Sequence, residues 1–127
     1  MPLYLYQCVD SQESFDRQLD HPHDRAEQAK PALDPMAVKV VADGIPFGEY
    51  TYVLVFEAPD DTTAAAVVIG VSATREVSSW KWTRLLSPEE WIEAMRKARV
   101  SPFMLLHPGG YPPDVPESER AAMPAQP

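Results

Sequence analysis

The sequence predicts an α+β fold of the ferredoxin-like type. Four segments rich in β-branched and aromatic residues are predicted as strands, and helical segments follow the first and the third of them. A further helix and a proline-rich tail come after the fourth strand. The predicted strands are residues 3–9, 37–42, 51–58 and 77–86, and the predicted helices are residues 20–30, 62–74 and 88–98. This βαββαβ order is that of a split βαβ sheet with an extra C-terminal helix and tail.

Each predicted strand has its own local signal. The first mixes Leu, Tyr and Val, and the second is a β-branched run that leads into the turn-rich segment 43–48. The third, residues 51–58, is the clearest strand of the chain. The fourth alternates, with Trp80 and Trp82 on one side and polar residues on the other.

The helices are predicted from their start and stop signals. The first begins at residue 20 or 21, has Pro22 in its first turn and ends near Pro31. The second follows an acidic segment that suits the positive end of a helix dipole. The third begins with a capping box, in which Ser87 stands three residues before Glu90.

Composition narrows the partners and the compartment. The 127 residues carry a formal net charge of -8, and this acidic balance repels nucleic-acid phosphates and anionic lipid headgroups. We therefore expect no nucleic acid and no membrane partner. The single cysteine, Cys8, cannot form an internal disulfide, the N-terminus lacks a signal-peptide pattern, and the longest uncharged apolar run, residues 64–71, is too short to span a bilayer. These features predict a cytoplasmic protein.

The predicted sheet has helices on one face only, so its other face needs a cover. A second copy of the same sheet would supply one, which predicts a homodimer. Residues 1–100 are predicted as the ferredoxin-like domain. Residues 101–127 are predicted as an extended or disordered arm, because 7 of the 14 prolines fall at or after Pro102.

Side-chain alternation places aromatic residues on one face of the predicted sheet. Rings with polar tips and one guanidinium suit a cavity for a planar organic ligand, whereas the alternative is that this face is core or dimer interface. Arg84 is the guanidinium, and a buried arginine needs either a carboxylate partner or an anionic ligand. The residues of this face are Tyr4, Tyr6, Cys8, Tyr52, Leu54, Phe56, Trp80, Trp82 and Arg84.

Two of the three histidines lie in the segment His21-Pro22-His23-Asp24. A metal site, a proton-transfer role and a solvated helix N-terminus are all compatible with it. The rigid proline and the lack of a third ligand at a telling spacing argue against metal, so no metal and no cofactor are predicted. The candidate catalytic residues are His23, Tyr6 and Arg84, and the candidate ligand-binding residues are Tyr4, Tyr52, Phe56, Trp80 and Trp82.

The middle of the chain resembles the GYD-domain family. That family is named for a Gly-x-Tyr-Asp motif ahead of a strand, and the motif's aspartate is Thr51 here. The resemblance covers roughly residues 37 to 98 and implies a fold of the dimeric α+β barrel superfamily and a dimer, but no particular activity. The segments that carry it are Gly48-Glu49-Tyr50-Thr51, Val53-Leu54-Val55-Phe56-Glu57-Ala58-Pro59-Asp60-Asp61 and Thr83-Arg84-Leu85-Leu86-Ser87-Pro88-Glu89-Glu90.

Two functional hypotheses follow. The first is a small-molecule-binding homodimer, which could be a cofactor-independent isomerase, cyclase or oxygenase acting on a hydrophobic or aromatic metabolite beside the sheet. The second is a non-catalytic ligand-sensing or accessory protein that binds a partner chain through residues 101–127. A closed aromatic pocket favours the first hypothesis, and a face filled by its own side chains contradicts it.

Overall fold

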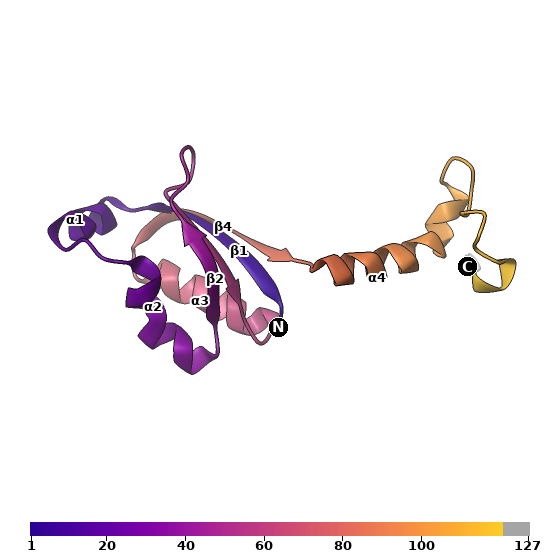
Figure 1. The fold of residues 1–127 in the computed structure, drawn as a ribbon. Helices are drawn as coiled ribbons and strands as arrows, with labels where there is room; N and C mark the ends of the chain where they lie inside the picture. Colours follow the sequence, from indigo (N-terminus) through magenta and orange to yellow (C-terminus); the bar gives the residue numbers. More distant parts are fainter. Residues whose placement is uncertain (121–127) are drawn as a thin grey trace, which may run out of the picture. The chain divides into compact units, whose positions relative to one another are not determined.

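The computed structural model describes residues 1–120. The chain divides into two compact units, with the boundary between Leu85 and Leu86. The first unit contains the sheet and three helices, and the second begins with the last helix (Figure 1). Each unit is described by itself below.

The first unit has the predicted ferredoxin-like topology. Its four strands form one antiparallel sheet in the order β2-β3-β1-β4, so β1 lies between β3 and β4 as expected. The elements in chain order are β1 (Leu3–Asp10), α1 (Gln12–Asp20), α2 (Arg25–Leu33), β2 (Lys39–Gly44), β3 (Tyr52–Glu57), α3 (Asp61–Ala73) and β4 (Val77–Leu85).

The register of the sheet separates its two faces. Tyr6 of β1 stands opposite Leu54 of β3 and Trp82 of β4, so these side chains share the face that carries the core. On this face Tyr4, Cys8 and Phe56 are fully buried. The opposite face carries Leu5, Val55 and Thr83, which also stand side by side but remain partly exposed.

The structure corrects the prediction for residues 10–36. Two short helices replace the single helix expected over residues 20–30, because two side chains cap new helix starts. The Ser11 hydroxyl accepts a hydrogen bond from the Ser14 amide at 3.1 Å, which starts α1. The Asp24 carboxylate accepts one from the Glu27 amide at 3.1 Å, which starts α2.

The predicted end of this helix is also wrong. Pro31 does not stop α2, which continues to Leu33. A proline has no amide hydrogen and therefore breaks one bond of the helix. Leu33, the next large apolar residue, is buried in the core, and this packing helps to hold the last turn of α2 despite the lost bond.

The second unit begins with α4 (Pro88–Arg99), whose predicted capping box is present. The Ser87 hydroxyl accepts from the Glu90 amide at 3.0 Å, and the Glu90 carboxylate accepts from the Ser87 amide at 3.0 Å. Beyond α4 the described chain contains two single 3₁₀ turns, Pro102–Leu105 and Glu117–Glu119. The remainder of the predicted arm, residues 121–127, lies outside the described residues.

Thr51, which stands at the aspartate position of the Gly-x-Tyr-Asp motif, closes the end of β1 against β3. Its hydroxyl accepts a hydrogen bond from the Asp10 amide at 2.7 Å and donates one to the Cys8 carbonyl at 3.3 Å. Its own amide donates to the same carbonyl at 2.9 Å. The side chain therefore satisfies the backbone amide of Asp10, the last residue of β1.

We expect the Thr51→Val variant to lower the free energy of unfolding by about 1–3 kcal/mol, because it leaves the Asp10 amide without its acceptor. Thr51→Ser keeps the hydroxyl and serves as the matched control. Urea denaturation of the three chains gives the comparison. Equal losses in the two variants would show that the hydroxyl is not the stabilising group.

Candidate functional site

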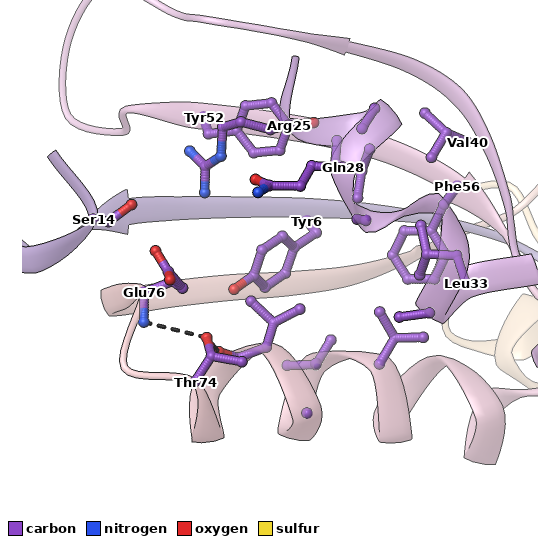
Figure 2. A pocket seen from close by; sticks show the side chains of 18 of the residues that line it. Tyr6, Ser14, Arg25, Gln28, Leu33, Val40, Tyr52, Phe56, Thr74 and Glu76 are labelled. Carbon is purple, nitrogen blue, oxygen red and sulfur yellow. Dashed lines mark hydrogen bonds between the residues drawn. The ribbon is translucent and has the colours of Figure 1, made fainter. Parts of the chain in front are cut away.

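A cavity of about 640 Å³ lies between the core face of the sheet and the helices α2 and α3 (Figure 2). This volume lies within the usual range for small-molecule sites. Most of its wall is apolar, and the two helices contribute small side chains to it. The apolar lining residues are Ala26, Ala29, Ala32, Leu33, Met36, Val40, Leu54, Phe56, Ala66, Val67, Val68, Gly70 and Val71.

One end of the cavity is polar. In Figure 2 the Tyr6 hydroxyl points away from Phe56, toward the end lined by Ser14, Arg25 and Glu76, which we call the polar end. Tyr6 is 4% exposed, and its hydroxyl has no nitrogen or oxygen partner among the described residues, while the Cys8 thiol beside it is only a weak acceptor. A buried polar group in that state costs stability, so this hydroxyl requires an explanation.

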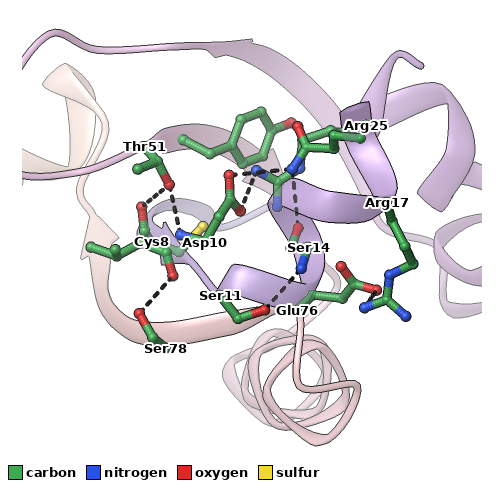
Figure 3. A network of polar contacts seen from close by, with 12 residues as sticks. Cys8, Asp10, Ser11, Ser14, Arg17, Arg25, Thr51, Glu76 and Ser78 are labelled. Carbon is green, nitrogen blue, oxygen red and sulfur yellow. Dashed lines mark hydrogen bonds and ion pairs between the residues drawn. The ribbon is translucent and has the colours of Figure 1, made fainter. Parts of the chain in front are cut away.

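An ion pair holds the polar end together (Figure 3). Arg25 Nη1 lies 2.7 Å from Asp10 Oδ1, and both side chains are largely buried. The Arg25 guanidinium also stacks over the Tyr52 ring, 4.2 Å from its centroid. Gln18 Nε2 lies 3.0 Å from Ser14 Oγ and 3.5 Å from Asp10 Oδ2, so it donates to the hydroxyl and weakly to the carboxylate.

The hydroxyl and thiol groups beside this ion pair stay protonated. Burial raises the pKa of Tyr6 above its ordinary value, and the nearby Cys8 thiol adds to the rise. Burial also raises the pKa of Cys8, although Arg25 opposes it. The pKa of Tyr52 is raised first by burial and then by its hydrogen bond to Asp43. These tyrosines are therefore hydrogen-bond donors at neutral pH.

Four of the candidate catalytic and ligand-binding residues predicted from the sequence line the cavity. Tyr6, Tyr52 and Phe56 come from β1 and β3 and form its floor. His23 lies in the exposed segment between α1 and α2, and its Nδ1 is 2.8 Å from the His21 carbonyl oxygen. Over β1 and β3 the residues of the predicted aromatic face therefore belong to the core, and several of them also line the cavity.

The other candidate site residues, Tyr4, Trp80, Trp82 and Arg84, do not line the cavity. Asp61 in the first turn of α3 contacts Tyr4 of β1 and Arg84 of β4. Tyr4 is fully buried, and its hydroxyl donates to Asp61 of α3 at 2.5 Å. Arg84 Nε lies 3.4 Å from the same carboxylate, so the structure gives Arg84 a carboxylate partner, one of the two predicted alternatives.

The two tryptophans of β4 lie on the same side of the sheet as Arg84. Trp82 stacks on Tyr4 with ring centroids 5.9 Å apart and belongs to the periphery of the core. Trp80 is 47% exposed. Neither residue lines the cavity.

Sequence reasoning missed Arg25 and Asp10. The alternation that places Tyr4, Tyr6 and Cys8 on the core face reaches Asp10 after one more step, so a buried carboxylate in need of a cation could have been predicted. No local signal identified Arg25 as its partner, since that pairing depends on how α2 packs.

Among residues 1–120, no group of three His, Cys, Asp or Glu side chains is arranged to hold a metal ion. Within the same part of the chain, no helix has both the length and the apolar character that a membrane span requires.

Comparison with known proteins gives one family match and a small number of similar solved structures. The GYD-domain family model matches residues 4–95, a stretch that also includes α1 and α2. No curated protein matches the chain significantly. The crystal structure of FFRP-DM1 is 12% identical, with a TM-score of 0.45, over 68% of this chain and 100% of that chain.

A second solved structure is 5-chloro-2-hydroxyhydroquinone dehydrochlorinase (TftG) from Burkholderia phenoliruptrix AC1100, in complex with 2,5-dihydroxybenzoquinone. It is 16% identical, with a TM-score of 0.47, over 68% of this chain and 96% of that chain. At this level of similarity, neither structure assigns a function to the chain.

We expect the first unit to lose stability as the pH rises from 10 to 12. Burial and the hydrogen bond to Asp61 raise the pKa of Tyr4 from 10.0 to about 12, so the unfolded chain releases this proton first. The free energy of unfolding therefore falls with pH across this interval. Tyr6 and Tyr52 act in the same direction.

The Tyr4→Phe variant should show a smaller fall, because it removes one of these protons. Urea denaturation at several pH values measures the difference. The two chains should show the same pH slope below about pH 9, where tyrosine is protonated in both states. Equal slopes above pH 10 as well would contradict the raised pKa of Tyr4.

Proposed function

The chain belongs to the GYD-domain family, and from that fold and its cavity we propose that it is a homodimer that binds a small hydrophobic or aromatic molecule beside the sheet. The observation that carries the proposal is the cavity itself. A core filled by its own side chains would leave no space of about 640 Å³ against Tyr6, Tyr52 and Phe56.

The wall of the cavity supports an apolar ligand. Aromatic rings from the sheet form the floor, and small residues of α2 and α3 form the roof. An apolar molecule that leaves water for this space gains about 25 cal/mol for each Å² of its apolar surface that is buried. The few polar groups gather at one end, which is the arrangement that orients a ligand.

We extend the proposal to a reaction that needs no cofactor, such as an isomerisation, a cyclisation or an oxygenation. Such a reaction develops negative charge on a ligand oxygen, and a preorganised donor in a dry site stabilises it. Tyr6 is the donor at the polar end. Arg25, which lines the cavity, is the cation that can stabilise this charge, in place of Arg84, which the sequence predicts for that role.

The open face of the sheet supports the homodimer. Leu5, Val53 and Val55 stand together there and are partly exposed, while the cavity and both of its helices lie on the other face. A second copy of this face would cover these apolar side chains.

One observation favours the alternative, an accessory protein that binds a partner chain. Three apolar residues of α4 are at least half exposed: Trp91 at 58%, Ile92 at 50% and Met95 at 54%. Phe103 and Leu106 of the following segment are exposed as well. Failure of the cavity to bind the probe described below would favour this alternative.

We expect the uncharged fluorescent probe N-phenylnaphthylamine to bind in the cavity and the Gly70→Phe variant to abolish its binding. Gly70 lines the cavity and a Cβ there meets no atom within 4 Å, so the wall has room for a ring that can occupy the cavity. Fluorescence titration measures the probe, and thermal unfolding checks that the variant folds. Because glycine disfavours helix by about 1 kcal/mol, the variant should be at least as stable.

The matched control is Ile69→Phe. Ile69 is the neighbouring residue of α3, is 68% exposed and does not line the cavity. This variant adds the same ring to the same helix and should leave probe binding unchanged. Loss of binding in both variants, or in neither, would contradict the cavity as the binding site.

We expect Leu5→Arg to separate the dimer into monomers, because it places a charge at the centre of the open face, between Val55 and Thr83. Sedimentation velocity measures the oligomeric state. Leu19→Arg is the control, since Leu19 is 79% exposed on α1 and lies outside this face. A monomeric unmodified chain would overturn the homodimer outright.

A further inference from the structure

We infer that the polar end of the cavity selects an uncharged ligand that carries a carbonyl oxygen, and that the Tyr6 hydroxyl donates a hydrogen bond to that oxygen. The inference rests on the proposed function, because it names the chemistry of the molecule that the cavity would bind.

Three tyrosines share one face of the sheet, and only two of them have a carboxylate acceptor. Tyr4 and Tyr52 each donate to a carboxylate, Asp61 at 2.5 Å and Asp43 at 2.7 Å. Tyr6 is buried to a similar degree, yet its hydroxyl finds no nitrogen or oxygen partner in residues 1–120, and the neighbouring Cys8 thiol is only a weak acceptor. Its hydroxyl points into the polar end of the cavity (Figure 2), where a ligand atom can supply the acceptor.

The ligand atom that accepts from Tyr6 can be a hydroxyl oxygen or a carbonyl oxygen. A ligand hydroxyl would bring a hydrogen of its own and would need an acceptor at this end. Each acceptor side chain that lines this end already has a donor: Ser14 Oγ accepts from Gln18, and Glu76 Oε1 faces Arg17 at 2.5 Å. A carbonyl oxygen accepts without donating, so it satisfies Tyr6 and creates no new unsatisfied group.

The charges at the polar end also restrict the ligand. The Arg25 guanidinium faces the Asp10 carboxylate at 2.7 Å, and Arg17 faces Glu76, so each of these cations has its own anion. A ligand carboxylate would add a second negative charge beside Asp10, whose side chain is 3% exposed. Two buried negative charges around one positive charge are unfavourable, and an uncharged head group avoids that penalty.

Three probes with the same ring system test the inference. Acetylnaphthalene carries a carbonyl, ethylnaphthalene lacks one, and naphthoate carries a negative charge at the same ring position. Calorimetry on the full chain at neutral pH gives the three dissociation constants. We expect acetylnaphthalene to bind the unmodified chain more tightly than either of the others.

The variants assign the effect to one hydroxyl. Tyr6→Phe should weaken acetylnaphthalene about tenfold, the typical value of one desolvated hydrogen bond, and leave ethylnaphthalene unchanged. Unchanged ethylnaphthalene binding also shows that this variant is folded. Tyr52→Phe is the matched control, because Tyr52 lines the same cavity but donates to Asp43, and it should preserve the order of the three probes.

The outcomes separate the inference from the proposed function. If naphthoate binds as tightly as acetylnaphthalene, the polar end is an anion site and the inference is wrong. If acetylnaphthalene and ethylnaphthalene bind equally, or if Tyr6→Phe changes neither, Tyr6 does not select the head group and the inference is wrong, while the cavity still binds ligands. If none of the three binds the unmodified chain, the proposed function fails as well.

Discussion

The contact between the Asp10 carboxylate and the Arg25 guanidinium, 2.7 Å apart, determines where α2 lies on the sheet. Leu33 is the one buried residue among the nine of α2, so apolar packing holds mainly the C-terminal end of this helix. Arg25 holds the N-terminal end through Asp10 and the ring of Tyr52. Removal of one partner from a buried ion pair costs about 3–5 kcal/mol, which exceeds what burial of a single leucine contributes.

The cavity follows from this arrangement and from the size of the helix residues. A helix anchored at its two ends can carry small side chains between the anchors, and α2 lines the cavity with Ala26, Ala29 and Ala32. On the other side α3 presents alanine, valine and Gly70. Large rings from the strands and small residues from the helices leave unfilled volume between them. The same sequence property that weakens the packing of α2 therefore creates the candidate site.

The strands, α3 and α4 could be predicted from the sequence because their signals are local. Alternation, a capping box and acidic residues at a helix start all act within a few residues. The helices α1 and α2 were mispredicted because the capping roles of Ser11 and Asp24 do not stand out in a segment that is polar throughout.

The candidate site was predicted in part for a similar reason. Alternation gives the face of a strand on which a residue lies, but not which part of that face a helix will cover. Tyr6 and Arg84 are on one face, yet the first turn of α3 is bound to Arg84 through Asp61 while Tyr6 stays at the cavity. The cation that reaches the cavity, Arg25, comes from a helix whose position depends on the long-range contact with Asp10.

The hydroxyl of Tyr6 cannot be explained by stability alone. A phenylalanine at this position would keep the ring against the core and would remove a buried donor without a partner, a change that is neutral or stabilising in a fold. The hydroxyls of Tyr4 and Tyr52 differ, since each donates to a carboxylate, Asp61 or Asp43. Residues that lower stability without a structural return are concentrated at functional sites, because selection acts there on binding or chemistry and only keeps stability above a threshold. Among the three tyrosines that share this face, the one without a partner is also the one whose hydroxyl points into the cavity, and a bound acceptor accounts for both facts.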